Sequence, residues 1–472
     1  MNAYLSTLDD VFTDDGPIAR SLERYTSRSA QLEMAQAVET ALAHGETLVC
    51  EAGTGTGKTF AYLAPVLRSG LRTLISTGTK NLQDQLFHRD LPILADALGV
   101  SAQAVLLKGR SNYLCLHRLD LCATEGRFYH REDAHHFQKI QSWSRHTHQG
   151  DIAEVASIPE DSTLWPRVTS NSDNCLGQEC NYYKDCFINR ARKRALEADV
   201  VVINHHLLFA DLALKENGFG ELLPNVEALV IDEAHQLPET AASYFGYSLT
   251  GRQLQELVTD ARTEHLKTAA DASGIAAAAD QLEKCVRDLR LAFGVESRRG
   301  AWEKVRHQPR LAGEVEFVHA ALIEMTAQLE PHAARAKGLE NCWRRSRELA
   351  GLLEHLTGET PEGYVQWFET TRRSFALHLT PLDVAEPFRA FIEAGERAWI
   401  FTSATLAVGQ QFEHFTQRLG LEMYTTGRWE SPFDYAQQGL LYLPKDLPEP
   451  NAPGYTAAVV QIALPVLEAS RG

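Results

Sequence analysis

The chain has 472 residues, of which 44% are hydrophobic and 23% are charged, and this length allows roughly two to four folded domains. No stretch approaches the ~20 consecutive apolar residues that span a membrane, and residues 1–15 are polar and acidic rather than signal-like. We therefore expect a cytoplasmic protein with no membrane contact. The net charge of −16 excludes a broadly basic nucleic-acid-binding protein, so any DNA contact must come from a local basic groove.

Short apolar runs bounded by turn residues recur along the chain, and helical patterns such as residues 30–43 and 60–67 separate several of them. Runs of this length without polar interruption are typical of strands buried on both faces of a parallel sheet. The alternation predicts an α/β fold with a doubly wound parallel sheet. The expected strands span residues 47–50, 73–76, 104–107, 200–203, 228–231 and 399–401.

Two long stretches interrupt this alternation. Residues 109–194 contain the clustered cysteines and few strand signals, whereas residues 240–374 are rich in Ala, Leu, Glu and Arg, a composition that favours helix. Because the chain returns to a buried strand after each stretch, we interpret both as insertions into one α/β domain.

A glycine-rich loop follows the first expected strand and opens a helix, with the sequence AGTGTGKT at residues 52–59. Glycines let backbone N–H groups turn toward phosphate oxygens, and the helix N-terminus adds partial positive charge. Lys58 can reach the β- and γ-phosphates of ATP, and the Thr59 hydroxyl can ligate Mg²⁺. A glycine-rich turn without a ligand is the alternative, which the strand–loop–helix context disfavours, although Ala52 replaces the usual first glycine. The predicted nucleotide-binding residues of the loop are Gly53, Thr54, Gly55, Thr56, Gly57, Lys58 and Thr59.

The sequence DEAH, residues 232–235, directly follows the expected strand at 228–231. Ligands of open α/β sheets bind at the carboxyl ends of the strands, so this segment belongs beside the glycine-rich loop. Asp232 is the predicted Mg²⁺ ligand, and Glu233 is the predicted base that orients and deprotonates the attacking water. An acidic pair after a strand is also often a solvated loop, but a phosphate loop in the same chain favours the catalytic interpretation.

Two further segments fit a nucleotide site. The hydroxyls of FTSATL, residues 401–406, follow another buried strand and can hydrogen-bond His235, which would couple the site to movement. Gln31 lies upstream of the glycine-rich loop, and its amide has the paired donor and acceptor that an adenine edge needs. A single Gln on a helix is usually just solvated, so the adenine role rests on position alone.

Taken together, AGTGTGKT, DEAH and FTSATL resemble the motifs of superfamily 2 helicases. Their order resembles the xeroderma pigmentosum group D branch, with its bacterial DinG-like and YoaA-like members, over essentially the whole chain. Further segments strengthen the resemblance: LLKGRSNYLC at residues 106–115, DVVVINHH at 199–206, GFGEL at 218–222 and SPF at 431–433.

The resemblance implies an ATP- and Mg²⁺-dependent helicase that translocates 5′ to 3′ on single-stranded DNA and unwinds forked DNA. It also implies a role in DNA repair and replication, with proteins of those processes as partners. The implied organisation is a RecA-like motor domain 1 at residues 1–108, 195–239 and 375–406, an iron–sulfur insertion at 109–194, a helical arch-type insertion at 240–374, and the start of motor domain 2 at 407–472.

Eight cysteines are too few for a disulfide scaffold in this chain, but four of them have informative spacing. Cys115, Cys175, Cys180 and Cys186 follow the pattern C-x59-C-x4-C-x5-C. Four thiols hold a 4Fe–4S cluster or a structural zinc, or stay unliganded, and spacing alone leaves all three open. The resemblance implies the 4Fe–4S cluster, and Cys122 is interpreted as a buried thiol.

A basic run follows Cys186 at residues 190–194. It supplies the local positive charge that single-stranded DNA binding requires on an acidic protein. Most charge runs are solvated helix faces, and that interpretation is the alternative.

Helicases of this type need arginines from a second motor domain to stabilise the transferring phosphate, and no Gly-Arg pair here has the expected context. Only residues 407–472 follow Leu406, so we expect an incomplete motor with little turnover on its own. The leading interpretation is an ATP-dependent DNA helicase. The alternatives are a truncated ATP- and single-stranded DNA-binding module without productive hydrolysis, and a P-loop ATPase unrelated to nucleic acid, against which the cysteine insertion argues.

Overall fold

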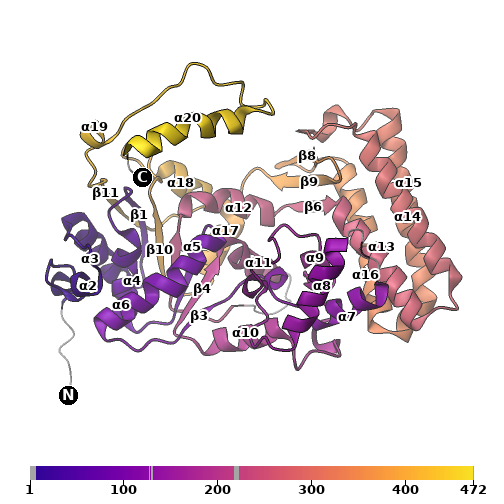
Figure 1. Cartoon of the computed structure of the whole chain (residues 1–472), viewed down its shortest axis with the longest axis horizontal. Helices are drawn as coiled ribbons and strands as arrows, with labels where there is room; N and C mark the ends of the chain where they lie inside the picture. The colour runs from indigo at the N-terminus through magenta and orange to yellow at the C-terminus, as the bar shows by residue number, and fades with distance from the viewer. Residues whose placement is uncertain (1–6, 127, 129–130, 217–222, 471–472) are drawn as a thin grey trace. The chain divides into compact units, whose positions relative to one another are not determined.

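A seven-stranded sheet is the main feature of the computed structural model, which describes residues 7–470 except 127, 129–130 and 217–222 (Figure 1). The strands lie in the order β11–β1–β10–β5–β2–β4–β3, and all neighbouring pairs are parallel. The predicted α/β class is therefore confirmed, whereas the GFGEL segment at 218–222 lies outside the described residues. The strands are β1 (Thr47–Ala52), β2 (Thr73–Thr77), β3 (Ala104–Leu106), β4 (Val200–Asn204), β5 (Ala228–Asp232), β10 (Ala398–Ser403) and β11 (Thr425–Trp429).

Side chains of this sheet alternate between two hydrophobic cores. In β4, Val200 and Val202 enter one core, whereas Val201 and Ile203 enter the other, as the two-residue period of a strand requires. Helices cover both faces, and this double burial explains why the strands appear in the sequence as continuous apolar runs. One core includes α1 (Leu8–Val11), α2 (Pro17–Ser21), α3 (Ser29–His44), α4 (Lys58–Ser69) and α6 (Leu91–Leu98), and the other includes α11 (His205–Glu216), α12 (Leu237–Tyr244), α17 (Ala385–Glu393) and α18 (Glu413–Arg418).

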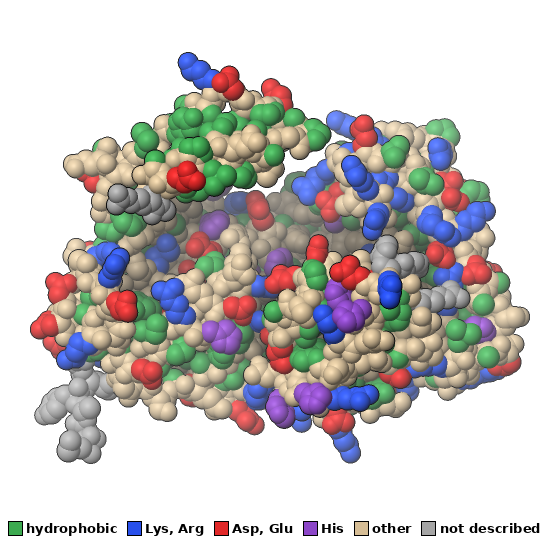
Figure 2. Space-filling model, in the orientation of Figure 1, with side chains coloured by type: hydrophobic (Ala, Val, Ile, Leu, Met, Phe, Trp, Pro, Cys, Tyr) green, Lys and Arg blue, Asp and Glu red, His purple; other side chains and the backbone are tan. Residues whose placement is uncertain are grey.

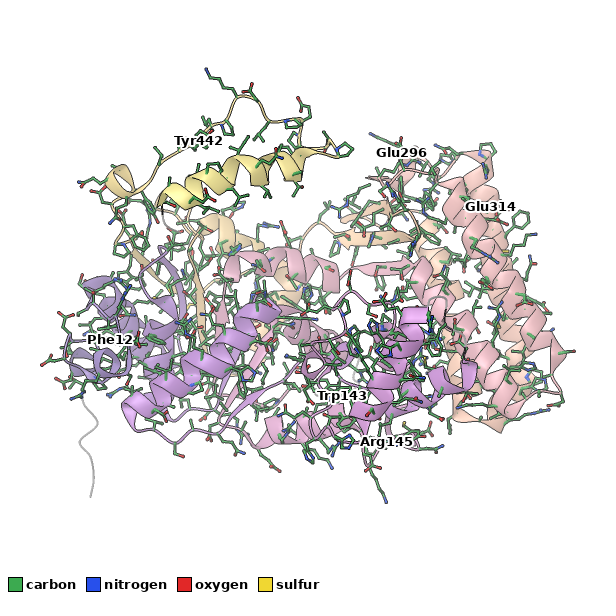
Figure 3. All side chains as sticks on the ribbon, in the orientation of Figure 1. Phe12, Trp143, Arg145, Glu296, Glu314 and Tyr442 are labelled. Atoms are coloured by element: carbon green, nitrogen blue, oxygen red, sulfur yellow. The ribbon has the colours of Figure 1, made fainter. Side chains whose placement is uncertain are left out.

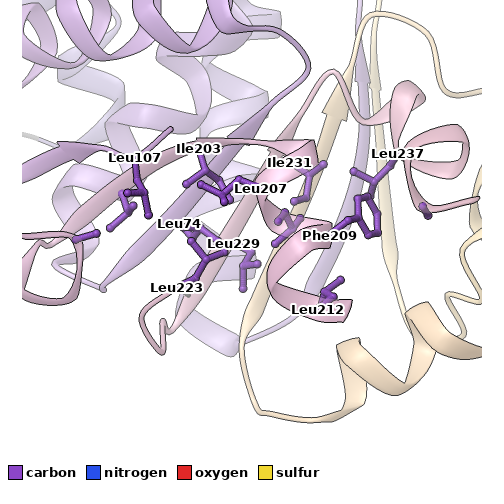
Figure 4. Close-up of a cluster of buried hydrophobic side chains, with 14 of the residues drawn as sticks. Leu74, Leu107, Ile203, Leu207, Phe209, Leu212, Leu223, Leu229, Ile231 and Leu237 are labelled. Carbon is purple, nitrogen blue, oxygen red and sulfur yellow. The ribbon is translucent and has the colours of Figure 1, made fainter. Parts of the chain in front are cut away.

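The second core holds the segment after β5 in place (Figure 4). Leu74, Ile203 and Ile231 come from three neighbouring strands, and each is at most 2% exposed. Phe209 of α11 is fully buried and stacks on Tyr244 of α12, with ring centroids 6.0 Å apart. Each such fully buried apolar side chain contributes about 1.5–3 kcal/mol. Because β5 and α12 both belong to this core, the DEAH segment between them is fixed at both ends.

Strand β11 was not predicted from the sequence. It pairs in parallel with β1, with Leu48 opposite Thr425 and Ala52 opposite Trp429, so residues 425–429 belong to this sheet and not to a separate domain that starts at residue 407. The strand lies at the sheet edge and its sequence, TTGRW, lacks an apolar run. An edge strand needs no double burial, so the signal that found the six other strands is missing here.

The cysteine insertion connects β3 to β4 and is mainly helical. Its buried residues Trp165, Phe187 and Ile188 join the second core of the sheet. Trp143 lies in this insertion (Figure 3). Its indole N–H donates to Glu154 Oε2 at 3.0 Å, which ties α8 to the segment that follows it. The helices are α7 (Leu116–Glu125), α8 (Arg131–Ser144), α9 (Trp165–Val168) and α10 (Phe187–Glu197).

The second insertion has its own core and its own sheet. Four long helices pack around leucines such as Leu282, Leu322 and Leu353, all fully buried. A four-stranded antiparallel sheet, in the order β6–β9–β8–β7, completes this insertion and was not predicted; its last strand ends at Pro381, beyond the expected boundary at 374. The elements are β6 (Tyr247–Thr250), α13 (Gly251–Thr268), α14 (Ser273–Ala292), β7 (Arg299–Ala301), α15 (Pro309–Leu329), α16 (Lys337–Thr357), β8 (Tyr364–Thr370) and β9 (Phe375–Pro381).

A buried charged cluster joins the two insertions. Asp260 of α13 contacts the guanidiniums of Arg118 in α7 and Arg345 in α16, the latter at 2.6 Å. All three side chains are at most 7% exposed. Burial alone would raise the pKa of Asp260, but the two guanidiniums hold it below its usual range. The carboxylate therefore stays ionised and serves as the shared acceptor of two buried cations.

Residues 431–472 form a second compact unit. It contains α19 (Tyr435–Gln438) and α20 (Tyr455–Ser470), and apolar side chains of α20 such as Val460 and Leu467 are more than half exposed. In the part of the chain with described positions, no helix is both long enough and apolar enough to cross a membrane.

The shared role of Asp260 predicts a large effect on stability. We expect Asp260→Asn to lower the free energy of unfolding by about 3–5 kcal/mol, because removal of one partner leaves buried charge uncompensated. Glu303→Gln is the control, because the Glu303 side chain is 67% exposed and its ion pair with Arg306 lies at the surface. This substitution should lower the free energy of unfolding by less than about 0.5 kcal/mol. Urea unfolding of the two variants gives the comparison, and equal losses would contradict this account.

Candidate active site

The glycine-rich loop between β1 and α4 has the shape of a phosphate cradle. Gly55 and Gly57 have φ angles of 87° and 85°, a left-handed conformation that residues with a Cβ rarely adopt. The Thr56 hydroxyl closes the turn by donating to the Gly53 carbonyl at 2.7 Å. Lys58 Nζ donates to the Ala52 carbonyl at 3.1 Å, so the Lys58 ammonium group lies against the backbone of the loop.

The carboxylate of Asp232 lies at the carboxyl end of β5, where it accepts a hydrogen bond from the Tyr62 hydroxyl of α4 at 3.3 Å. Burial, reinforced by the neighbouring Glu233 carboxylate, raises the pKa of Asp232 to about 7, and the positive charge of Lys58 offsets this only in part. A bound divalent cation would lower the pKa of Asp232, because nearby positive charge favours the ionised carboxylate. This chemistry fits the predicted role of Asp232 as a Mg²⁺ ligand.

Glu233 is the only non-glycine residue with positive φ in the described chain, at 55°. Such a conformation costs on the order of 1–3 kcal/mol and persists where the surroundings enforce it. Here it turns the Glu233 carboxylate toward His235 and Ser403, with Glu233 Oε2 3.4 Å from His235 Nδ1. His235 Nδ1 is in turn 2.9 Å from Ser403 Oγ, so the hydrogen bond predicted between FTSATL and the DEAH histidine is present.

Gln31 packs directly against the phosphate loop and is 2% exposed. Its Nε2 donates to the Gly57 carbonyl at 3.0 Å, and its Oε1 accepts from the Tyr25 hydroxyl at 3.0 Å. A Cβ added at Gly57 would lie 2.1 Å from Gln31 Nε2, so this contact requires glycine. Gln31 is thus not a solvated helix residue, and reading an adenine edge requires it to exchange one of these bonds.

Glu51, the residue before the loop, was missed by the sequence reasoning. Its Oε2 accepts from the backbone N–H groups of Leu406 and Ala407 at 2.7 and 2.8 Å. Its Oε1 lies 3.1 Å from Nε of Arg428 on β11. One carboxylate therefore joins the phosphate loop, the loop after β10 and the edge strand. The one available signal was an acidic side chain at the end of an otherwise apolar strand.

The four predicted cluster cysteines face one region of the cysteine insertion. Burial, together with smaller contributions from the thiols of Cys175 and Cys180, raises the pKa of Cys115 to about 11. Burial also raises the pKa of Cys180, and the thiols of Cys175 and Cys186 contribute in the same direction. The four thiols therefore lie within electrostatic range of one another. Among residues whose positions are described, no three Cys, His, Asp or Glu side chains form a group able to hold a metal ion, so the thiols are not gathered at ligand distances.

Positive charge and backbone donors surround these thiols. The Gly177 N–H donates to Cys175 Sγ at 3.4 Å, and a backbone hydrogen bond from Arg118 reaches Cys115. Burial and the nearby Arg110 together lower the pKa of Arg192 to about 10, although Cys175 and Cys186 act in the opposite direction. Arg192 is therefore not on a solvated face, although Lys193 and Arg194 of the same basic run are exposed.

Three sequence motifs thus meet at adjacent strands. The phosphate loop follows β1, FTSATL ends β10, and DEAH follows β5, in the spatial order β1–β10–β5. A phosphate cradle beside an acidic pair, with Asp232 buried and Glu233 partly exposed, and a hydroxyl-bearing loop defines the nucleotide-hydrolysing motor domain of a helicase.

Comparison with known proteins identifies the family. Residues 32–140 match the family DEAD/DEAH box helicase. The chain is 43% identical over 470 residues to the ATP-dependent DNA helicase YoaA of Haemophilus influenzae, covering 99% of this chain and 73% of the relative. It is 42% identical to YoaA of Escherichia coli, covering 98% and 73%, and 32% identical to the ATP-dependent helicase DinG of Mycobacterium tuberculosis, covering 92% and 68%. The chain belongs to the YoaA and DinG family of ATP-dependent DNA helicases.

The contacts of Glu51 predict that its charge holds the loop after β10. Glu51→Ala should lower the free energy of unfolding by about 2–3 kcal/mol, since it removes charge-assisted hydrogen bonds and leaves two N–H groups without their acceptor. Glu51→Gln retains a carbonyl acceptor and should lose less than half as much. Urea unfolding of both variants tests this, and equal losses would show that the carboxylate oxygens do not hold the loop.

Proposed function

We propose that the protein is a Mg²⁺-dependent ATPase that translocates 5′ to 3′ on single-stranded DNA, unwinds forked DNA and acts with replication or repair proteins. The observation that carries the proposal is the meeting of the phosphate loop, the acidic pair and FTSATL at three adjacent strand ends, bridged by the 2.9 Å contact between His235 and Ser403. Membership of the YoaA and DinG family supports DNA as the substrate. The eight free cysteines suit the reducing cytoplasm in which we place its action.

Each side chain of the site has a specific task in this proposal. Lys58 exchanges the Ala52 carbonyl for the β- and γ-phosphates of ATP, while backbone N–H groups of the loop bind their oxygens. Thr59 and Asp232 would hold Mg²⁺, which supplies charge neutralisation on the phosphates. Glu233 orients the attacking water and accepts its proton, in a carboxylate position fixed by the strained backbone. Gln31 would contact the adenine after releasing a present partner.

Movement would be transmitted through the residues behind the acidic pair. His235 contacts both Glu233 and Ser403, so loss of the γ-phosphate would alter contacts that lead into β10. Glu51 ties the loop that follows β10 to the base of the phosphate loop. These contacts give the site a direct link between hydrolysis and a change in backbone position.

We further propose that Cys115, Cys175, Cys180 and Cys186 hold a 4Fe–4S cluster. The donor set fits this group in its chemistry, because it offers four thiols, backbone N–H donors and the cations Arg118 and Arg192 near the sulfurs. The cluster would tie together two distant parts of the insertion, the segment at Cys115 and the segment from Cys175 to Cys186. Cys122 is buried in the hydrophobic core of the sheet, in keeping with a plain core thiol.

The main test compares ATP binding and DNA-stimulated phosphate release in Lys58→Ala and in the parent chain. Lys58 is the only cation of the phosphate loop, so its loss should lower turnover at least about 10³-fold. Lys304→Ala, at an exposed position of the helical insertion, is the matched control and should leave turnover unchanged.

Three outcomes are distinct in this test. Turnover that depends on Lys58 supports the helicase proposal. A parent chain that binds ATP and single-stranded DNA without hydrolysis supports the binding-module alternative. Full DNA-stimulated turnover in Lys58→Ala rules out the assigned site.

Metal content tests the cluster proposal. Protein purified without oxygen should contain about four iron atoms per chain. Cys180→Ser should lose most of this iron, whereas Cys285→Ser, which changes a buried thiol of the helical insertion, should retain it. Zinc in place of iron in anaerobic preparations would disprove the assignment.

A further inference from the structure

A cavity of about 200 Å³ lies in the helical insertion, away from the residues assigned to ATP and to the cluster. Three elements form it: the start of α13, the end of α14 and the turn between β8 and β9. Its floor is apolar, with Val286 and the ring of Phe375 both 2% exposed, and Leu291, which is 59% exposed, forms part of its edge.

Three arginines line this cavity, and none of its lining residues in the described chain is acidic. Arg290 is 7% exposed and donates to the backbone carbonyls of Thr371 and Gly294, and no carboxylate of the described residues forms an ion pair with it. Arg287 and Arg373 are exposed and lie at the rim. The arrangement of Arg290 is unusual in a chain of net charge −16, because a buried cation normally has an acidic partner.

Arg287 at the rim forms a weak ion pair, because its guanidinium lies 4.0 Å from the Glu283 carboxylate. The same carboxylate is 2.7 Å from Arg262, which is its closer partner. The turn that carries Arg373 is fixed, since the Thr371 N–H donates to the Ser374 carbonyl at 2.9 Å. Glu283 therefore compensates the charge of Arg287 only in part, and the backbone of a defined turn presents Arg373 at the rim.

We propose that this cavity binds one nucleotide of single-stranded DNA, with the base in the apolar cavity and the adjoining phosphate at Arg287 and Arg373. A cavity of about 150 Å³ takes up one benzene ring, so about 200 Å³ is enough for a pyrimidine. The arginine forks match phosphate oxygens, and Arg290 adds uncompensated positive charge below them. A duplex keeps its bases stacked inside and cannot fill such a cavity, so the site selects single strands.

This inference rests on the proposed function, because it takes the DNA strand of the helicase as the source of the nucleotide. A free nucleotide offers the same chemistry. Lys and Arg side chains also gather on the face of the helical insertion seen in Figure 2, which suits a polyanion longer than one nucleotide.

The experiment measures fluorescence anisotropy of labelled oligothymidine with the full chain, without ATP, over a series of salt concentrations. Arg373→Glu is compared with Arg372→Glu, which makes the same charge change at the neighbouring exposed position of the same turn but outside the cavity. Arg373→Glu should weaken binding about tenfold and reduce the salt slope by about 1, while Arg372→Glu should change the affinity less than about twofold. An abasic strand should bind the parent chain at least about fivefold more weakly than oligothymidine.

Several outcomes would overturn the inference. Equal effects of Arg373→Glu and Arg372→Glu on the affinity would show that Arg373 contributes only general surface charge. Full affinity for the abasic strand would show that the cavity binds no base. Binding of thymidine monophosphate that Arg373→Glu abolishes, with oligothymidine binding unchanged, would identify a free nucleotide as the ligand. A parent chain that binds no oligothymidine contradicts the proposed function itself, which separates the two failures.

Discussion

The parallel pairing of β10 between β1 and β5 determines where the chemistry of this protein takes place. The chain reaches β10 only after both insertions, yet Val49 lies opposite Phe401 and Phe401 lies opposite Ile231. Parallel strands point their carboxyl ends to the same edge, so the phosphate loop, FTSATL and DEAH must meet there. The two cores of the sheet hold this pairing, and the insertions extend from it without interrupting the order of the strands.

Burial and charge oppose each other at each functional position, and the balance differs from site to site. At Asp232, burial and Glu233 prevail over Lys58 and raise the pKa, so an added cation would stabilise the ionised carboxylate. At Asp260, two guanidiniums prevail over burial, which gives a permanent ionic link between the insertions. At Arg290 no carboxylate takes part, and the charge is left for a ligand. An acidic protein thus concentrates its usable positive charge in a few defined places.

Much of this architecture follows from patterns in the sequence. The six apolar runs predict β1 to β5 and β10, because burial on both faces favours apolar residues at successive positions, and each run starts at or within one residue of the observed strand. The motif residues Lys58, Asp232, Glu233 and His235 meet as predicted because strand order fixes them.

Other features depend on contacts between distant segments and could not be predicted. Strand β11 is polar, and only its pairing with β1 makes it a strand. The sheet of the helical insertion pairs Ser248 with His378 across four helices. Gln31 was assigned to an adenine by its position, whereas its present partners, Gly57 and Tyr25, come from the folded loop. The link between Glu51 and Leu406 spans most of the chain, and no local signal marks it beyond an acidic residue in an apolar strand.

We propose that one site binds ATP through the phosphate loop and hydrolyses it through Glu233. The most direct test of this proposal is to measure ATP affinity and turnover side by side in Glu233→Gln, which keeps the size of the side chain and removes its basicity. The account predicts ATP affinity within about twofold of the parent chain and DNA-stimulated turnover at least about 100-fold lower, the usual contribution of a general base. Turnover at the parental rate in Glu233→Gln would contradict it, because the base would then lie elsewhere.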